Sequence, residues 1–294
     1  MNLRVRNKLV RQCMAEFLGT MILIMIGDGS VAQYVLSGQA AGPLGINFLS
    51  VNVAWGVAVA MGVYCSAGVS GGHINPAVSL AMAIAKKITM LQCIAYSAAQ
   101  YLGAIVGSAV VYGVYYDALN NFDGGTRKTE GPKATAGIWS TFPQEFLSTG
   151  IGFMDQVVGT AILLLCVMGI TDQKNAGAPP GVVPLAVGTA VLGIGASFGF
   201  NCGYALNPAR DLGPRLFTAM AGWGPDPFSF RGVNWFWIPI LAPHLGAILG
   251  VFLYLLLVGL HHEEDAVEEE KTGTSENTPN GTKKNQVAVS VTSM

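Results

Sequence analysis

The chain has 294 residues, of which 51% are hydrophobic and 11% are charged, and its formal net charge is −1. Soluble domains carry about 25% charged residues, so this composition excludes an ordinary soluble protein and predicts a membrane protein. The near-neutral charge argues against a nucleic-acid partner. The cysteines are scattered, which predicts neither a metal site nor a disulfide framework. They are Cys13, Cys65, Cys93, Cys166 and Cys202.

Six apolar stretches are long enough to cross a bilayer, whose hydrocarbon core of about 30 Å takes roughly 20 helical residues. They run near Cys13–Leu36, Ile46–Ala67, Met90–Tyr116, Met154–Thr171, Val182–Phe200 and Trp235–Leu260. The first is long enough to span, so we interpret it as a transmembrane helix rather than a cleavable signal peptide.

Basic residues predict the orientation of the chain. Arg4, Arg6, Lys8 and Arg11 precede the first stretch with no acidic residue among them, which predicts a cytoplasmic N-terminus. Six crossings then place the C-terminus on the same side. The predicted organisation is a cytoplasmic segment over 1–12, a first repeat over 13–116, an extracellular connecting loop over 117–153, a second repeat over 154–260 and a disordered cytoplasmic tail over 261–294.

The two halves of the chain resemble each other. Residues 15–20 are similar to 155–160, and residues 100–107 are similar to 243–250. Three spans per half is an odd number, so the halves must have opposite orientations in the membrane. The sequence therefore predicts an all-α membrane protein with an inverted 3+3 repeat, an architecture typical of transport.

Each half also contains an Asn-Pro-Ala sequence after a glycine-rich run, at Asn75 and at Asn207. Asn at the N-cap followed by Pro at N1 is a strong helix start. Only about eleven residues follow each start, which is half a bilayer at about 1.5 Å per residue. We expect two re-entrant loops, with extended glycine-rich runs, whose half-helices meet N-terminus to N-terminus at the bilayer centre.

This meeting point has a predictable chemistry. Each helix N-terminus carries roughly +0.5 charge, which repels cations, while the amides of Asn75 and Asn207 can donate to a neutral solute. Arg210 follows closely, and an intramembrane arginine indicates function. A structural ion pair with Asp211 is the alternative. Adjacent helix residues do not face each other, so we expect Arg210 to line a pore while Asp211 faces elsewhere.

The stretches 70–78 and 199–215 identify a resemblance to the major intrinsic protein (aquaporin) family. The resemblance covers about residues 10–260 and is strongest to aquaglyceroporins of the vertebrate aquaporin-3, -9 and -10 group. It implies six transmembrane helices plus two re-entrant half-helices and one pore per subunit. It also implies a homotetramer in the plasma membrane that needs no cofactor and is not an enzyme.

The resemblance further assigns site residues. The outer constriction falls on Trp55, Gly195, Tyr204 and Arg210, and Gly195 stands where water-selective members have His. The pore wall includes Gly71, Gly72, His73, Gly203 and Ala205. Markers of glycerol channels are Asp211, Arg215, and Pro239 followed by Ile240.

Two polar residues within the spans are predicted to brace the re-entrant loops. We expect Glu16 to accept hydrogen bonds from backbone N–H groups of the first loop. Its repeat counterpart is Gln156, where many family members have Glu, and the neighbouring Asp155 is expected to face another way. Trp223, Trp235 and Trp237 flank the last span and are predicted to form an interfacial belt.

The predicted function is passive conduction of glycerol, water and other small neutral solutes, urea among the candidates, with exclusion of protons and ions. Gly195 and Asp211 argue against a water-selective channel. A secondary transporter would need a coupling-ion carboxylate at the midplane, where this chain has Asn and Arg. A membrane enzyme is disfavoured because the sequence contains no metal cluster, nucleophile–base set or cofactor motif.

Overall fold

The computed structural model describes residues 4–38 and 47–262, and this part of the chain consists of helices and the loops that join them, with no strand. Its α-helices are α1 (Lys8–Leu36), α2 (Phe48–Ser70), α3 (Pro76–Ile84), α4 (Met90–Val114), α5 (Tyr116–Asp123), α6 (Thr149–Thr171), α7 (Val183–Cys202), α8 (Pro208–Thr218) and α9 (Ile238–Leu257). Helices α1, α2, α4, α6, α7 and α9 are long and apolar enough to cross a membrane. The prediction of six spans and two half-helices is confirmed.

The helix ends differ from the prediction in an informative way. α2 continues to Ser70 and α7 to Cys202, so the first part of each glycine-rich run is helical and only the remainder is non-helical. Each helix ends at a left-handed glycine, Gly71 with φ +98° and Gly203 with φ +77°. Backbone groups in hydrocarbon must be satisfied internally, so the helix continues until a residue can turn the chain without strain.

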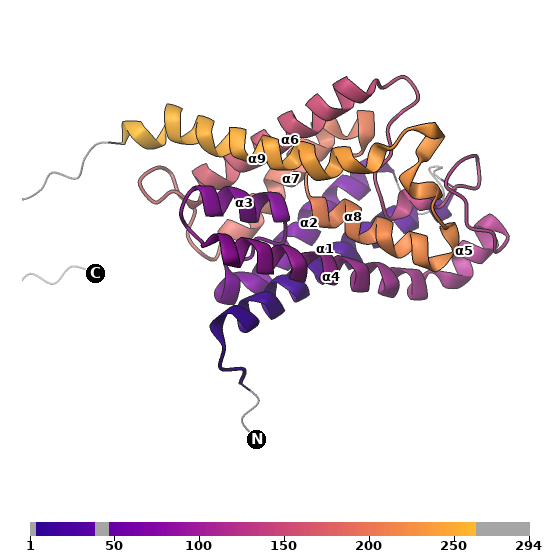
Figure 1. The fold of residues 1–294 in the computed structure, drawn as a ribbon, viewed down its shortest axis with the longest axis horizontal. Helices are drawn as coiled ribbons and strands as arrows, with labels where there is room; N and C mark the ends of the chain where they lie inside the picture. The colour runs from indigo at the N-terminus through magenta and orange to yellow at the C-terminus, as the bar shows by residue number, and fades with distance from the viewer. Residues whose placement is uncertain (1–3, 39–46, 263–294) are drawn as a thin grey trace, which may run out of the picture. The chain divides into compact units, whose positions relative to one another are not determined.

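The helices pack as two equivalent sets (Figure 1). α1 packs against α2 and α4, and α6 packs in the same way against α7 and α9. α2 contacts α7 across the two sets, while α3 contacts both α9 and α4, and α8 contacts both α4 and α9. Each half-helix therefore lies between its own repeat and the last span of the other, as an inverted repeat requires.

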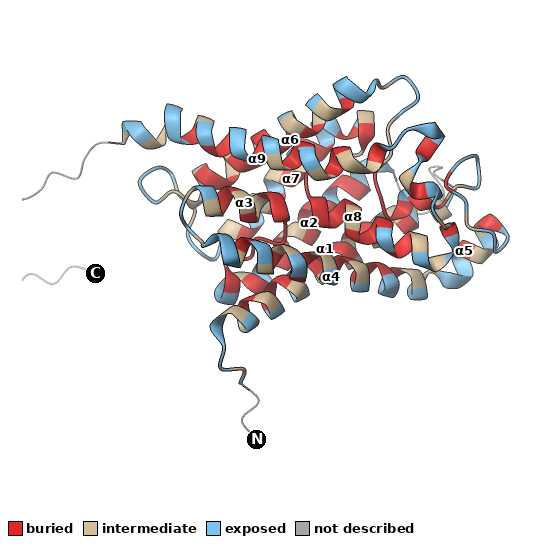
Figure 2. Cartoon of the chain, viewed as in Figure 1, coloured by how far each residue is buried: buried red, intermediate tan, exposed pale blue. Residues whose placement is uncertain are grey.

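Glycines allow the close crossings within each set. A Cβ on Gly103 of α4 would lie 2.3 Å from the Phe17 carbonyl oxygen of α1, and one on Gly246 of α9 would lie 2.3 Å from the Val157 carbonyl oxygen of α6. Small residues at such crossings let helix backbones approach closely in a membrane. Buried residues lie mostly toward the interior of the bundle and exposed residues toward its outside (Figure 2). Many of the exposed residues are large and apolar, such as Leu91 and Phe252.

One feature of the connecting segments contradicts the prediction. The connecting segment over 117–153 contains most of the short helix α5, and its boundaries stay a prediction, but the tryptophans lie elsewhere than expected. Trp223 and Trp235 are 3% and 1% exposed, so they are core residues and not part of an interfacial belt. Trp223 packs on the Trp139 ring, with the ring centroids 4.9 Å apart. The predicted tail over 261–294 lies outside the described residues, apart from residues 261 and 262.

Candidate functional site

The two half-helices begin at asparagine caps. Asn75 Oδ1 accepts from the Ala77 N–H at 2.8 Å, and Asn207 Oδ1 accepts from the Ala209 N–H at 3.0 Å. Proline occupies the first helical position of both α3 and α8. The local sequence therefore fixes both starts, because the side chain satisfies a backbone donor that the helix leaves free.

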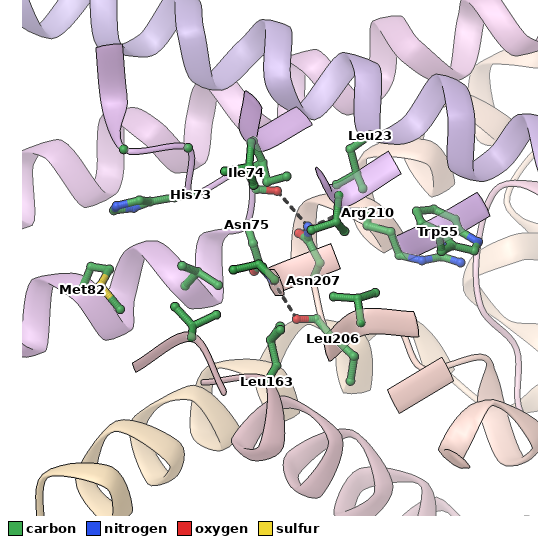
Figure 3. Close-up of a pocket in the computed structure, with 18 of the residues that line it drawn as sticks. Leu23, Trp55, His73, Ile74, Asn75, Met82, Leu163, Leu206, Asn207 and Arg210 are labelled. Carbon is green, nitrogen blue, oxygen red and sulfur yellow. Dashed lines mark hydrogen bonds between the residues drawn. The ribbon is translucent and has the colours of Figure 1, made fainter. Parts of the chain in front are cut away.

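The same asparagines join the two loops to each other (Figure 3). Asn75 Nδ2 donates to the Leu206 carbonyl at 3.0 Å, and Asn207 Nδ2 donates to the Ile74 carbonyl at 2.8 Å. Ile74 and Leu206 both have left-handed backbones, with φ +46° and +54°. Non-glycine residues usually avoid this conformation. Here it presents each carbonyl to the opposite asparagine.

Glu16 of α1 braces the first loop. One carboxylate oxygen accepts from the Ser70 hydroxyl at 2.5 Å and from the His73 N–H at 3.0 Å. The other accepts from the Ile74 N–H at 2.7 Å and from Gln100 Nε2 at 2.8 Å. The carboxylate is completely buried, and four donors replace the water that it would otherwise need.

Gln156 of α6 holds the second loop with fewer bonds. Its Oε1 accepts from the Leu206 N–H at 3.1 Å, and its Nε2 donates to Asp155 Oδ1 at 3.1 Å. Asp155 Oδ2 accepts from Asn201 Nδ2 of α7 at 2.8 Å. The prediction that Asp155 faces away was wrong: the long Gln156 side chain folds back to reach it, and both support the end of α7 before the loop.

Two cavities meet at a constriction. A central cavity of about 150 Å³ is lined by both loops, both asparagines and a wall of aliphatic side chains that includes Leu23 and Leu163. A vestibule of about 730 Å³ opens on one end. Three residues line both cavities and therefore mark the passage between them: Trp55, Tyr204 and Arg210. Gly195 lines the vestibule beside them.

Arg210 lies across the face of Trp55, its guanidinium carbon 4.3 Å from the ring centroid. The two side chains lie side by side at one end of the cavity in Figure 3. Within the described residues, the hydrogen bond of the guanidinium runs from Nη1 to the Trp139 carbonyl at 3.4 Å. Arg210 is only 8% exposed. The Trp139 carbonyl and the Trp55 ring satisfy few of the five N–H donors of its guanidinium.

Asp211 pairs with Arg215, one helical turn later, and not with Arg210. Arg215 Nη2 lies 2.8 Å from Asp211 Oδ1, and both side chains are completely buried. Asp211 Oδ2 accepts from the Thr141 N–H at 2.8 Å and from its hydroxyl at 2.5 Å. Neither charged residue lines the two cavities. Together they attach the loop around Thr141 to α8, and that loop supplies the Trp139 carbonyl to Arg210.

Two glycines make room for the aromatic side chains of the constriction. A Cβ on Gly195 would lie 2.7 Å from Tyr204 Cζ, and a Cβ on Gly27 would lie 2.3 Å from Trp55 Cζ3. Gly195 therefore provides more than an open space in the lumen. It lets the Tyr204 ring lie directly against the α7 backbone.

The remaining predicted residues fall into two groups. Gly71, Gly72, His73 and Ala205 line the central cavity, and Gly203 lines the vestibule. The His73 Nδ1 atom lies 3.2 Å from Ser79 Oγ. In contrast, Pro239 and Ile240 lie in the first turn of α9 and line neither cavity.

Sequence reasoning missed several residues of this site. Gly27 seats Trp55, the Trp139 carbonyl binds Arg210, Thr141 binds Asp211, and Asn52 accepts from the Tyr204 hydroxyl at 2.7 Å. A polar Asn52 one helical turn before Trp55 in an apolar stretch was a usable signal. The other three depend on how distant segments meet, which the sequence does not display.

Comparisons with known proteins agree on one family. The model of the family described as Major intrinsic protein matches residues 4–254. Human Aquaporin-10 is 47% identical over 263 residues, covering 90% of this chain and 86% of the relative, and human Aquaporin-9 is 47% identical over 276 residues, covering 94% and 91%. Aquaporin-10 of Milnesium tardigradum is 51% identical over 271 residues, 88% of this chain, which spans 65% of that relative.

A solved structure gives the same result. The X-ray structure of the aquaglyceroporin from Plasmodium falciparum matches with a TM-score of 0.76 and 33% identity, covering 86% of this chain and 98% of that one. Six membrane-length helices, two half-helices joined at their caps and a match over residues 4–254 lead to one conclusion. The chain is a member of the major intrinsic protein family.

Proposed function

We propose that this protein is a passive channel for glycerol, water and other small neutral solutes that excludes protons and other cations. The observation that carries the proposal is the composition of the constriction. The aromatic faces of Trp55 and Tyr204 and the guanidinium of Arg210 are the three surfaces shared by the two cavities. A polyol has a carbon side and a hydroxyl side, and this passage offers an apolar surface to one and hydrogen-bond donors to the other.

Proton and cation exclusion follows from the centre of the pathway. The N-termini of α3 and α8 meet at Asn75 and Asn207, and each contributes roughly +0.5 charge. One hydrogen of each Nδ2 is used in the bond to the opposite loop, so the second is available to a solute. A neutral hydroxyl can accept that hydrogen, whereas a cation meets donors and positive dipoles.

Glycerol is favoured over water alone by the same geometry. Gly195 seats the Tyr204 ring against α7, which leaves the lumen wider than a bulkier residue at this position would. Asp211 and Arg215 support conduction of glycerol indirectly, because they fix the loop whose Trp139 carbonyl contacts Arg210. Pro239 and Ile240 match the sequence pattern of glycerol channels but contribute no surface to either cavity.

The proposal also includes the oligomeric state, the membrane and the orientation of the protein. The protein is an integral membrane protein, and we place it as a homotetramer in the plasma membrane with both termini cytoplasmic. Arg4, Arg6 and Lys8 next to α1 support this orientation by the positive-inside rule. Large apolar side chains on the outside of the bundle, such as Leu91 and Phe200 at 67% and 72% exposed, suit contact with lipid or with neighbouring subunits.

The test is solute flux in proteoliposomes. Purified protein is reconstituted, and light scattering follows vesicle volume after an osmotic step with glycerol, urea or an impermeant sugar, with empty liposomes as the control. Rapid glycerol and water flux that is linear with the gradient is the expected result. Water flux without glycerol flux would indicate a water-selective channel. Glycerol accumulation driven by a proton or sodium gradient would indicate a secondary transporter.

A further inference from the structure

Tyr204 has a backbone conformation that tyrosine rarely adopts. Its φ is +36°, in the left-handed region. The equivalent position of the first repeat, three residues before Asn75, is Gly72, whose φ is +67°. The turn is thus common to both repeats, and a glycine would make it without strain. A strained non-glycine residue persists only where the surroundings hold it, and such residues concentrate at functional sites.

One side of the Tyr204 ring is held by shape alone. Gly195 and Gly199 lie one turn apart on α7. A Cβ on Gly195 would lie 2.7 Å from Cζ of the ring, and a Cβ on Gly199 would lie 3.0 Å from Cδ1. The ring therefore lies on bare helix backbone. This seat prevents movement into α7, but it does not prevent movement of the ring away from α7, into the passage.

The tip of the ring is held by a hydrogen bond. The Tyr204 hydroxyl donates to Asn52 Oδ1 of α2 at 2.7 Å, and the two residues are 6% and 3% exposed. Asn52 lies three residues before Trp55, so the same face of α2 carries one aromatic wall of the constriction and the anchor of the other. A buried hydroxyl without this acceptor would have to find another partner.

We propose that Asn52 is a positioning residue that determines the selectivity of the constriction by holding the Tyr204 ring against α7. The proposal rests on the glycerol channel function proposed above. With its hydrogen bonded to Asn52, which itself lines the vestibule, the hydroxyl is held at the α2 side of the constriction and the ring presents its apolar face to the passage. Without the anchor, the hydroxyl turns toward the passage to find water. The ring then narrows the lumen, which hinders glycerol more than the smaller water molecule.

The experiment is a double-mutant cycle on permeability ratios. Asn52→Leu removes the acceptor but keeps the branched shape of the side chain, and Tyr204→Phe removes the hydroxyl but keeps the ring. We expect Asn52→Leu to lower the ratio of glycerol to water permeability about fivefold, equivalent to about 1 kcal/mol. In the Tyr204→Phe background the same substitution should leave the ratio unchanged, because no hydroxyl remains to be displaced. An equal effect in both backgrounds, or none in either, overturns the proposal.

Controls separate this mechanism from loss of folding and from failure of the proposed function. Ser66→Ala removes another buried polar group of α2, whose hydroxyl bonds to the Gly62 carbonyl at 2.7 Å, and should not change the ratio. Asn52→Ser keeps a polar group too short to reach Tyr204 and should reproduce the Asn52→Leu ratio even if the leucine variant folds poorly. A wild-type protein without glycerol flux would refute the channel function. A conducting wild type with an unchanged Asn52→Ser ratio would refute only the role of Asn52.

Discussion

The buried pair of Asp211 and Arg215 gives the sharpest stability prediction. Both side chains are completely buried. Beyond the pair, Arg215 donates to the Pro227 carbonyl at 2.6 Å and the Thr141 carbonyl at 2.7 Å. One guanidinium therefore joins α8 to two separate loop segments. Truncating it to methionine removes those bonds and leaves the Asp211 carboxylate buried with only the Thr141 donors.

The expected loss of stability in Arg215→Met follows from these contacts. Removing one partner of a buried ion pair costs about 3–5 kcal/mol, because the remaining charge is uncompensated. In a chain of this size, 1 kcal/mol corresponds to about 2–4 °C, so Arg215→Met should lower the apparent melting temperature by on the order of 10 °C. The loop with Trp139 should loosen as well, so Arg210 loses its acceptor and the selectivity for glycerol over water falls.

The assay compares detergent-solubilised variants by size-exclusion chromatography after heating. Arg231→Met is the matched control, because Arg231 pairs with Glu145 at 3.0 Å while both side chains are exposed, and such pairs contribute about 0–1 kcal/mol. Asp211→Asn combined with Arg215→Met should recover part of the loss, since no unpaired charge remains. An Arg215→Met variant as stable as Arg231→Met, or a double variant no better than the single one, would refute the reasoning.

Three further predictions concern the constriction and the cluster at Asp172. Arg210→Ala should admit larger or charged solutes in a flux panel, and unchanged solute selection would reject it as a filter residue. Gly195→Ala should already lower glycerol flux severalfold more than water flux, and Gly195→His further, because a Cβ there overlaps the Tyr204 ring. Bonds from His262 and then Tyr254 hold the pKa of Asp172 below its usual range. Their stabilisation is present above about pH 4, the ordinary pKa of an aspartate, and is lost as the pH falls through the lowered pKa. Asp172→Asn should therefore lower the melting temperature by about 2 °C at neutral pH and by progressively less as the pH falls below about 4.

The sequence predicted those parts of the fold that depend on local chemistry. Spans follow from the length of apolar stretches, and the starts of α3 and α8 follow from an Asn-Pro pair whose side chain caps its own helix. The joining of Asn75 and Asn207 to opposite loops was not predicted. That bond needs left-handed backbones at Ile74 and Leu206, and neither β-branched isoleucine nor leucine signals such a conformation.

The predictions that failed depended on packing between distant segments. Trp223 and Trp235 were assigned to the membrane interface by the general preference of tryptophan, but Trp223 fills a core with Trp139 and a Cβ on Gly152 would lie 2.7 Å from the Trp235 ring. Asp155 was assigned away from Gln156 by ideal helix geometry. A flexible side chain reached it nevertheless, because Asn201 draws the carboxylate toward α7.

The two repeats share a scaffold and differ where selection takes place. Bonds from Asn75 and Asn207 to the opposite loops are equivalent, and so are the left-handed glycines that end α2 and α7. In contrast, the position three after the asparagine is Val78 in the first repeat and Arg210 in the second.

At two further positions the second repeat has a larger or charged residue where the first has a small one. Gly72 corresponds to Tyr204, and Ser79 corresponds to Asp211. These second-repeat residues serve one end of the pathway, where Tyr204 and Arg210 line the constriction and Asp211 fixes the adjoining loop. A symmetric pair of half-helices can repel cations from both sides, since the positive N-termini point at the centre. It cannot present a donor on one wall and an aromatic face on the other at the same level. Recognition of an amphipathic solute therefore requires the repeats to diverge, and the divergence is concentrated around Asn207.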